Sequence, residues 1–506
     1  MAPTRLAAAA AAALLCAALA WLNPAHAWHA RPDAAPQADA ALAAKARAIH
    51  DRVLKLDTHN DINVNHFTPD CNYTLRLTNQ VNLPKMAAGD MDAAFLIVYT
   101  GQGPLTPDGY ASAYRRASDM FDAIHRLTGS IAPGAIGLAL TPADVVRLHK
   151  AGKRAAVIGI ENGYPVGEDL GRVKEFFDRG GRYMSLAHNG NSQLSDSNTG
   201  EVQGFLHGDG LSPLGRQVVA EMNRLGMMID VSHPSKGSMM QAIALSKAPI
   251  IASHSSVRAL ANHSRNLDDE QLLALKKNGG VVQTVAFSSY VKVDPPERTA
   301  ALATLREAFG LTMASGRGAG SGRGAGRGGD AGAAAGAAPG AAPGAAPAPA
   351  AGSLVRPSVP GMGGTTPPCP VEDPNNPPAA RGGGRGGRGA AALQALSPER
   401  RAEYEKRLAE IDARWPAAGR ANVADFVNHI DYAVELIGID HVGISSDFDG
   451  GGGVDGWNSA AEAFNVTLEL VRRGYTEEQI ARLWGGNLLR VWGEVEKVAA
   501  QIQAKR

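Results

Sequence analysis

Short apolar runs recur along the chain, and each ends in a polar side chain followed by a residue that favours a turn. Apolar or β-branched runs of this length, bounded by turn residues, predict strands. Several of them contain almost no polar residue, as expected for strands that are buried on both faces of a parallel sheet. We predict eight strands, at residues 53–56, 94–99, 155–160, 183–187, 227–231, 250–253, 281–287 and 442–445.

Between most of these strands, apolar residues recur at helical spacing with polar residues between them. Amphipathic stretches of this kind predict helices that lay one face on the sheet. Strands and helices in alternation argue for parallel βαβ units, and eight such strands are the number that closes a (β/α)8 barrel. We therefore expect an α/β fold of the TIM-barrel type. The predicted helices are residues 112–127, 172–179, 213–225, 239–245, 268–277, 398–414 and 423–437.

One segment, residues 314–392, breaks this alternation because it consists almost entirely of Gly, Ala, Pro and Arg. It has too few large apolar residues to offset the entropy lost on ordering, so we predict a disordered insertion. It falls between the seventh and eighth strands and divides the catalytic barrel into residues 28–313 and 393–506. Its Arg/Gly repeats are similar to segments that bind single-stranded nucleic acid. They lack interleaved aromatic residues, however, and we favour a solvated spacer.

The first 27 residues have the pattern of a secretory signal peptide. Arg5 provides a positive start, residues 6–22 are rich in Ala and Leu, and Ala27 ends a small-x-small cleavage motif. A transmembrane helix needs about 20 apolar residues, whereas this run ends sooner, at Asn23-Pro24. We therefore predict export to a periplasmic or extracellular space after cleavage near Ala27.

Composition and cysteine content narrow the kind of site that the barrel can hold. The chain has 506 residues, 44% of them hydrophobic, and a formal net charge of +1, so no overall field favours nucleic acid or an anionic membrane. After cleavage it would keep only Cys71 and Cys369. An oxidising compartment permits a disulfide between them, and the sequence leaves that pairing open. Two cysteines provide no thiolate metal site, so any metal must bind nitrogen and oxygen ligands.

Five potential metal ligands lie at or just beyond the predicted strand ends. They are His59, Asp61, Glu161, His233 and His254. A parallel barrel collects the carboxyl ends of its strands on one face, so these groups are expected to converge on one pocket. Each has a commoner structural explanation when taken alone, such as a hydrogen-bonded turn, a helix cap, an ion pair or a buried histidine. Their joint occurrence on successive strands favours a metal centre and a hydrolytic enzyme.

Three further polar residues follow predicted strands or lie near them. His188 is a candidate ligand, transition-state donor or support for the ligands. Arg265 is suited to hold a substrate carboxylate in a bidentate contact, or it pairs with Asp268 or Asp269. Asp447 precedes a glycine run and is a candidate general acid or base, ligand or loop cap.

The local sequence around these residues resembles the membrane (renal-type) dipeptidase family, which comprises zinc peptidases with an amidohydrolase-like barrel. The resemblance extends from residue 59 to about residue 492, interrupted by the insertion, and its most specific motifs are DTHNDIN, GIENG, LAHNGNS, IDVSHPS, SHSSVRALANHSRN and GISSDFDG. It implies two zinc ions (Zn2+) per chain, with Glu161 bridging them. His59 and Asp61 would bind one ion, and His233 and His254 the other.

The resemblance also implies an activity and the residues that carry it out. The substrate is a dipeptide, and a metal-bridging hydroxide attacks its peptide bond. His188 would contact the substrate and polarise its carbonyl group, Arg265 would bind the C-terminal carboxylate, and Asp447 would transfer protons. We thus expect an exported binuclear zinc dipeptidase with small-molecule substrates and no nucleic-acid partner.

Two alternative functions stay open on the sequence alone. A related amidohydrolase that acts on another amide, a lactone or a β-lactam would share the metal ligands without needing Arg265. A binding or scaffold protein would use the Arg/Gly-rich insertion and leave the barrel inert. The chain ends in EVEKVAAQIQAKR, without the apolar tail of lipid-anchored family members, so no stable membrane anchor is expected. The oligomeric state is open, with a homodimer as one alternative.

Overall fold

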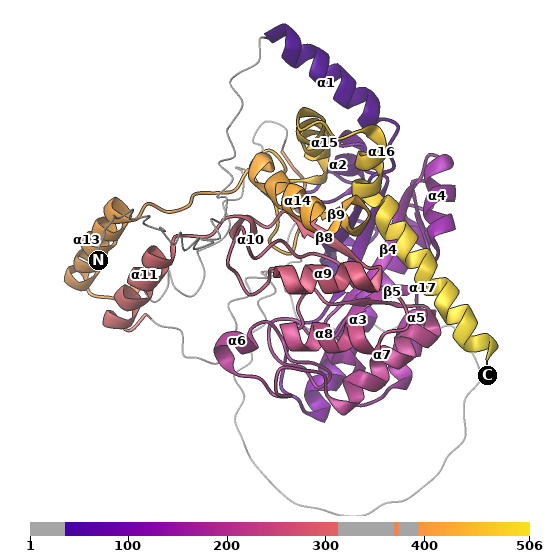
Figure 1. The fold of residues 1–506 in the computed structure, drawn as a ribbon, viewed down its shortest axis with the longest axis horizontal. Coiled ribbons are helices and arrows are strands. Elements are labelled where there is room, and N and C mark those ends of the chain that lie inside the picture. Colours follow the sequence, from indigo (N-terminus) through magenta and orange to yellow (C-terminus); the bar gives the residue numbers. More distant parts are fainter. Residues whose placement is uncertain (1–35, 312–368, 374–392, 506) are drawn as a thin grey trace, which may run out of the picture. The chain divides into compact units, whose positions relative to one another are not determined.

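The computed structural model describes residues 36–311, 369–373 and 393–505, and the chain divides into two units (Figure 1). The first unit, residues 1–41, contributes only the beginning of helix α1, and the second, residues 42–506, contains every described strand. The predicted signal peptide lies outside the described residues, as does the predicted insertion apart from residues 369–373. The strands are Leu56–Asp61 (β1), Ala93–Tyr99 (β2), Ile136–Leu138 (β3), Arg154–Glu161 (β4), Gly181–Ser185 (β5), Met228–Asp230 (β6), Ile251–Ala252 (β7), Val281–Val285 (β8) and Val442–Ser445 (β9).

The described strands form one parallel sheet that closes into a barrel. Its order is β1-β2-β4-β5-β6-β7-β8-β9, and the short strand β3, which was not predicted, pairs with β4 outside this path. At the seam, a parallel bridge joins Asn60 to Phe448, and the Asp61 N–H donates a 2.9 Å hydrogen bond to the Phe448 carbonyl oxygen. The predicted (β/α)8 barrel is confirmed, and residues 312–368 fall in the connection between β8 and β9.

The first strand begins later than predicted. The apolar run at residues 53–56 was expected to form it, but β1 begins at Leu56 and continues through the polar residues DTHND. The reason lies partly in Lys55, which is buried and whose ammonium group donates hydrogen bonds of 2.7 and 2.6 Å to two preceding main-chain carbonyl oxygens. These bonds hold the chain before β1 in a turn, so the apolar run is an approach to the strand.

The polar residues of β1 find partners across the seam of the barrel. Asp57 accepts hydrogen bonds from the N–H group (3.0 Å) and the hydroxyl group of Ser446, which follows β9. A buried carboxylate must be paired in this way to be tolerated inside a barrel. As a result, His59 and Asp61 lie within β1 itself, and the prediction that they follow the first strand was wrong by a few residues.

The helices predicted at residues 213–225, 398–414 and 423–437 are confirmed with these bounds as α7, α13 and α14. Their ends carry clear signals: α7, for example, starts after Ser212, whose side chain accepts a hydrogen bond from a main-chain N–H, and ends at Gly226 in the left-handed conformation (φ 86°).

The α-helices are Pro36–His50 (α1), Leu83–Ala88 (α2), Pro107–Arg126 (α3), Pro142–Lys150 (α4), Gly171–Asp178 (α5), Gly200–Gln203 (α6), Pro213–Leu225 (α7), Lys236–Leu245 (α8), Asp269–Asn278 (α9), Ser288–Val291 (α10), Pro296–Ala308 (α11), Pro398–Arg414 (α13), Val423–Ile437 (α14), Ala463–Arg472 (α15), Glu477–Ala481 (α16) and Asn487–Ala504 (α17). Within the described part of the chain, we find no helix with the length and hydropathy that a membrane crossing requires.

Helix α17 covers the amino-terminal end of the barrel. Its apolar residues form one buried cluster with the first residues of several strands, among them Leu56 and Met228. The ring of Trp492 is fully buried, with its centroid 6.3 Å from that of Phe95 in β2. This end of the barrel is therefore filled by side chains, and the polar strand ends lie at the opposite, carboxyl-terminal end.

Residues 369–373 lie inside the predicted insertion but are attached to the loop before α2. Cys369 forms a disulfide with Cys71 across a sequence separation of 298 residues, so the two cysteines do pair. Val371 forms a β-bridge with Leu77, and Glu372 forms ion pairs with an arginine (2.8 Å) and a lysine (2.6 Å) of the same region. For these five residues the prediction of disorder was wrong, because a covalent bond and a buried lysine partner compensate for the weak apolar content.

Removing this disulfide should lower stability. Closing a loop of this length restricts the unfolded chain, and native disulfides typically contribute about 2–4 kcal/mol. We expect the double variant C71S/C369S to lose about this much free energy of unfolding, measured by urea denaturation of the metal-loaded protein. Reductant should shift the wild-type midpoint and leave that of the double variant unchanged. Identical midpoints for the two proteins without reductant would count against a stabilising bridge.

Candidate metal centre and active site

His59 is held in β1 with one ring nitrogen available for a metal. The Tyr183 hydroxyl donates a hydrogen bond to the Thr58 carbonyl oxygen (3.1 Å) and so accepts one from His59 Nδ1 (2.9 Å). A proton on Nδ1 leaves a lone pair on Nε2, the arrangement found in metal-binding imidazoles. His59 Nε2 is buried and has no hydrogen-bond partner among the described residues.

A glycine makes room for this tyrosine. Gly159 lies in the middle of β4, and a Cβ atom there would overlap the Tyr183 ring. Glycine inside a strand often marks such a close approach. The small residue in the run AAVIGI therefore acts on the metal site indirectly, because a side chain at 159 would displace the hydroxyl that orients His59.

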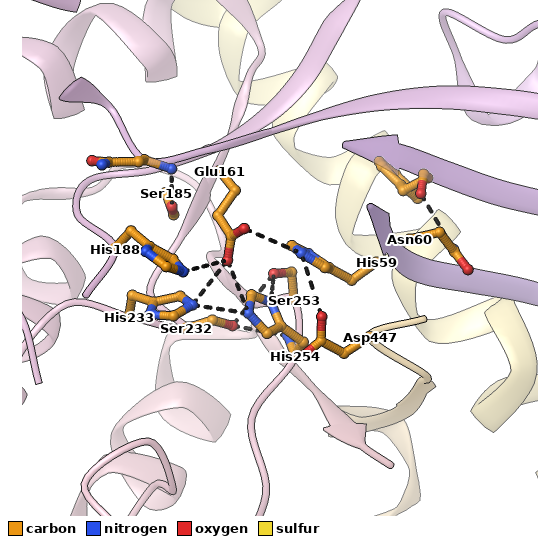
Figure 2. A network of polar contacts seen from close by, with 12 residues as sticks. His59, Asn60, Glu161, Ser185, His188, Ser232, His233, Ser253, His254 and Asp447 are labelled. Carbon is orange, nitrogen blue, oxygen red and sulfur yellow. Dashed lines mark hydrogen bonds and ion pairs between the residues drawn. The ribbon is translucent and has the colours of Figure 1, made fainter. Parts of the chain in front are cut away.

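Glu161, at the carboxyl end of β4, lies with His59 on one side and a second group, His188, His233 and His254, on the other (Figure 2). Its Oε1 atom lies 2.9 Å from His233 Nε2 and 3.3 Å from His254 Nε2. Its Oε2 atom faces the other way and lies 3.6 Å from His59 Nε2. With one oxygen toward each group, this carboxylate can be shared by two cations.

A chain of hydrogen bonds orients His254. The Ser253 hydroxyl donates to Asp230 Oδ2 (2.6 Å) and so accepts from His254 Nδ1 (2.8 Å). Asp230, the last residue of β6, also accepts hydrogen bonds from the N–H groups of Ser232 (3.0 Å) and Ser253 (2.8 Å). His254 Nε2 therefore carries its lone pair toward the site, where it lies 3.1 Å from His233 Nε2. Imidazole nitrogens and a carboxylate oxygen that converge in this way favour a cation between them.

Without a cation, burial shifts the pKa values of these carboxyl and imidazole groups in the direction that favours their uncharged forms. Burial, and next the nearby Glu161 carboxylate, raises the pKa of Asp61 to about 7. Burial also raises the pKa of Glu161 and lowers the pKa of His188 to about 4. The pKa of His254 lies well below its ordinary value for the same reason. Neutral imidazoles are the form that binds metals, and a bound cation would stabilise the ionised carboxylates.

The five predicted ligands are brought together, and their donor atoms fit metal ions. Asp61 Oδ1, like His59 Nε2, is buried without a hydrogen-bond partner in the described part of the chain. A buried carboxylate oxygen without a partner is costly unless a cation binds it. Three sets of residues have ligand atoms within 4.8 Å of one another: His59, Glu161 and His254; Glu161, His188 and His233; His59, Asp61 and Asp447. Imidazole and carboxylate ligands suit zinc and also other first-row divalent metals.

A cavity of about 340 Å³ opens beside this cluster, and His188, Arg265 and Asp447 all line it. His188 Nε2 lies 3.7 Å from Glu161 Oε1, and its ring packs edge-on against Tyr99 with 4.9 Å between centroids. The three residues predicted to act on a substrate thus line the same cavity as four of the candidate ligands, namely Asp61, Glu161, His233 and His254.

Arg265 is buried at the edge of this cavity. Its guanidinium donates a hydrogen bond to the His254 carbonyl oxygen (3.1 Å), and its Nε–H has no partner among the described residues. The aspartates considered as its partners, Asp268 and Asp269, instead accept hydrogen bonds from a lysine (2.7 Å) and a tyrosine (3.0 Å). Arg265 therefore has donor capacity left for an anion in the cavity.

Asp447 follows β9 in the left-handed conformation, with φ at 56°. Its Oδ1 lies 3.9 Å from His59 Nε2, and burial, followed by the Asp61 carboxylate, raises its pKa well above the ordinary value. The glycine run after it has a steric purpose, because a Cβ atom at Gly450 would overlap Asp447 Oδ1 and approach Asp61 Oδ2. Both carboxylates depend on this close approach of the main chain.

Replacing Gly450 by Ala should therefore impair activity without removing any ligand. The added methyl group would push the two carboxylates away from their positions, and misplacements of about 1 Å can lower rates by up to roughly a hundredfold. We expect kcat/KM to fall by about tenfold or more, measured with saturating metal. Gly134→Ala serves as the control for the added methyl group itself, because Gly134, like Gly450, is outside the left-handed region and has no atom within 4 Å of an added Cβ. An unchanged kcat/KM in the Gly450 variant would contradict the steric argument.

Residues 43–506 match the sequence pattern of the membrane dipeptidase family (Peptidase family M19). The chain belongs to this family. The probable dipeptidase PvdM from Pseudomonas aeruginosa, whose crystal structure is known, is 31% identical to this chain, with a TM-score of 0.66, and the match covers 92% of this chain and 100% of that one. The resemblance drawn from the motifs is confirmed.

Two fungal dipeptidases are also similar to this chain. Dipeptidase aclJ from Aspergillus oryzae is 26% identical over 465 residues, which is 89% of this chain and 80% of that protein. Dipeptidase tcpJ from Claviceps purpurea is 34% identical over 229 residues, which is 44% of this chain and 53% of that protein. The crystal structure of a metallo peptidase from Rhodobacter sphaeroides, 19% identical with a TM-score of 0.56 over 88% of this chain and 99% of that one, supports the fold alone. The predicted metal-dependent dipeptidase is confirmed by the family and its relatives.

Three residues that support the candidate ligands were not predicted. Tyr183 orients His59, Asp230 orients His254 through Ser253, and Asp57 holds the turn after β9 that carries the glycine run. A signal was present for the two aspartates, since each is an acidic residue within or directly after an apolar run. No local signal marked Tyr183, because its partners lie on another strand.

Proposed function

We propose that this chain is an exported dipeptidase that uses two zinc ions bridged by Glu161. The observation that carries the proposal is the orientation of the Glu161 carboxylate, whose Oε1 faces His233 and His254 and whose Oε2 faces His59. In this assignment His59 and Asp61 hold one ion, and His233 and His254 hold the other. The hydrogen bonds that place a proton on Nδ1 of His59 and of His254 support it, because they leave both Nε2 atoms as ligands.

Bound zinc would supply Lewis acidity, which lowers the pKa of a coordinated water and polarises a carbonyl oxygen. His188 is neutral because burial lowers its pKa to about 4, so it would donate a hydrogen bond from Nε2 to the scissile carbonyl oxygen as charge develops there. Asp447 Oδ1 would accept the proton of the attacking nucleophile and deliver it to the departing amine. Its Oδ1 lies 3.9 Å from His59 Nε2, beside the proposed ligands, which is the position that such a proton transfer requires.

Arg265 would hold the carboxylate at the C-terminus of the dipeptide. Its buried guanidinium lines the same cavity as Glu161 and His188 and has an unused Nε–H donor. A buried guanidinium binds a carboxylate strongly when two N–H groups can donate in parallel. The requirement for a free carboxylate next to the cleaved bond would make the enzyme an exopeptidase acting on dipeptides.

Export is supported by two independent features. The first is the signal-peptide pattern of residues 1–27. The second is the disulfide between Cys71 and Cys369, because such bonds persist mainly in oxidising compartments. A periplasmic or secreted location would satisfy both.

The deciding experiment combines metal analysis with a dipeptide panel. The purified protein should contain two zinc ions per chain, hydrolyse dipeptides, lose activity on removal of the metal by a chelator, and regain it when zinc is added. The panel should include N-acetylated dipeptide amides and a β-lactam, which test the alternative amidohydrolase activities. A single equivalent of metal at full activity would overturn the binuclear assignment, and hydrolysis of amides in preference to free dipeptides would overturn the role of Arg265.

A further inference from the structure

The short helix α6 (Gly200–Gln203), labelled in Figure 1, carries an exposed valine, Val202, at the edge of the cavity. Val202 is 91% exposed, yet it lines the same cavity as Arg265, Glu161 and His188. An apolar side chain of this size gains from removal from water. Ligand cavities place apolar groups beside a few oriented polar ones for that purpose. A ligand that fills this cavity would therefore remove the Val202 side chain from water.

The segment that carries Val202 is tied to the loop that carries Arg265. The Glu201 carboxylate accepts two hydrogen bonds of 2.8 Å from the Arg258 guanidinium, one to each oxygen. The Asn198 side-chain amide donates a 2.9 Å hydrogen bond to the hydroxyl of Ser264, the residue directly before Arg265. Bidentate Arg–carboxylate pairs are geometrically specific. These contacts hold the valine at a set position relative to the Arg265 guanidinium.

The other side of the segment is also anchored. The ring of Phe205 packs on Gly200 so closely that a Cβ at Gly200 would overlap it. The Asp196 carboxylate accepts hydrogen bonds from the N–H groups of Leu206 (2.7 Å) and Gly210 (3.1 Å). Because the segment is anchored on both sides of Val202, this side chain stays at the cavity wall, and its methyl groups stay exposed there.

We propose that Val202 forms the apolar wall of the subsite for the side chain of the substrate's C-terminal residue, so that the preferred dipeptides end in an apolar residue. The inference rests on the proposed function of Arg265 as the carboxylate anchor. The side chain next to that carboxylate belongs to the C-terminal residue, and α6 is tied to the same loop. The scissile carbonyl lies farther in, toward Glu161 and His188, so the N-terminal residue is the one directed at the metals.

The test compares two substrates that differ only in the side chain at issue. We expect Val202→Ser to lower kcat/KM for Gly-Leu by roughly tenfold, mostly through KM, because losing a few buried methyl or methylene contacts typically changes discrimination by 10–200-fold. Gly-Gly has no side chain to contact the wall, so its kcat/KM should stay within about twofold. Val202→Ile should retain the preference for Gly-Leu, since it keeps the apolar surface.

Leu206 provides the matched control. It is an apolar residue in the same loop, 53% exposed, and is not among the residues that line the cavity. Leu206→Ser should leave the ratio of kcat/KM for Gly-Leu and Gly-Gly unchanged. Equal losses for both substrates in Val202→Ser, or no loss for either, would overturn the subsite. A wild-type enzyme that hydrolyses neither dipeptide with zinc bound would overturn the proposed function itself, which is a separate result.

Discussion

Replacing Glu161 by Gln should lower kcat/KM for dipeptides by on the order of a thousandfold, which corresponds to about 4 kcal/mol of transition-state stabilisation. The amide keeps the shape of the side chain but replaces one carboxylate oxygen by an NH2 group, which cannot bind a metal. Because one oxygen faces His233 and His254 and the other faces His59, either orientation of the amide disrupts one of the two groups. The measurement is kcat/KM in excess zinc, together with the zinc content after dialysis.

The matched control is Glu469→Gln, since Glu469 is also buried but is paired with two arginines of its own region. This variant should lose some stability and keep its metal content. If the Glu161 variant retained two zinc ions and most of its activity, the bridging role would be refuted.

Replacing Arg265 by Met should abolish the preference for substrates with a free C-terminal carboxylate. Removing one partner of a buried, hydrogen-bonded charge pair typically costs 2–5 kcal/mol, which is roughly a factor of 30 to several thousand in kcat/KM. Methionine fills similar volume without charge, so the loss reports the ionic contact and not a cavity. The corresponding dipeptide amides, which carry no carboxylate, should be affected far less. The ratio of kcat/KM for the acid and the amide is therefore the informative quantity.

Arg265→Lys gives the conservative comparison. Lysine keeps the charge but not the planar fork that matches a carboxylate, so we expect activity between that of the wild type and the Met variant. Near-normal dipeptide hydrolysis by the Met variant would favour the alternative of an amidohydrolase with another amide or lactam as substrate.

The barrel was predictable because its elements carry strong local signals. The runs AAFLIVY and AVIGI are buried on both faces and read as strands without reference to the rest of the chain. Helix α14 begins at Val423, directly after Asn422, whose side chain forms a capping box with Asp425, and its predicted start was therefore correct. Strand β1 has the opposite character, because its polar residues find their partners on other parts of the barrel, such as Ser446 for Asp57 and Tyr183 for His59.

The same distinction applies to the site. The five candidate ligands could be found because the carboxyl ends of the strands in a parallel barrel lie on one face. This inference requires only the positions at which the strands end. Gly159 and Tyr183 were missed because their importance lies in a contact between two strands. The attachment of Cys369 was also unpredictable, since its surroundings are rich in Pro and Gly and contain no periodic pattern that sets a distance to Cys71.

The disulfide between Cys71 and Cys369 makes a covalent ring out of most of the barrel, since 298 residues separate the two cysteines. Hydrolysis of one peptide bond anywhere within that ring leaves the two pieces joined as a single molecule until the disulfide is reduced. The Gly- and Pro-rich stretch before Cys369 falls inside the ring. In a compartment that contains other proteases, a single cut within the ring therefore does not release a fragment. Release of a fragment also requires a reductant that breaks the disulfide.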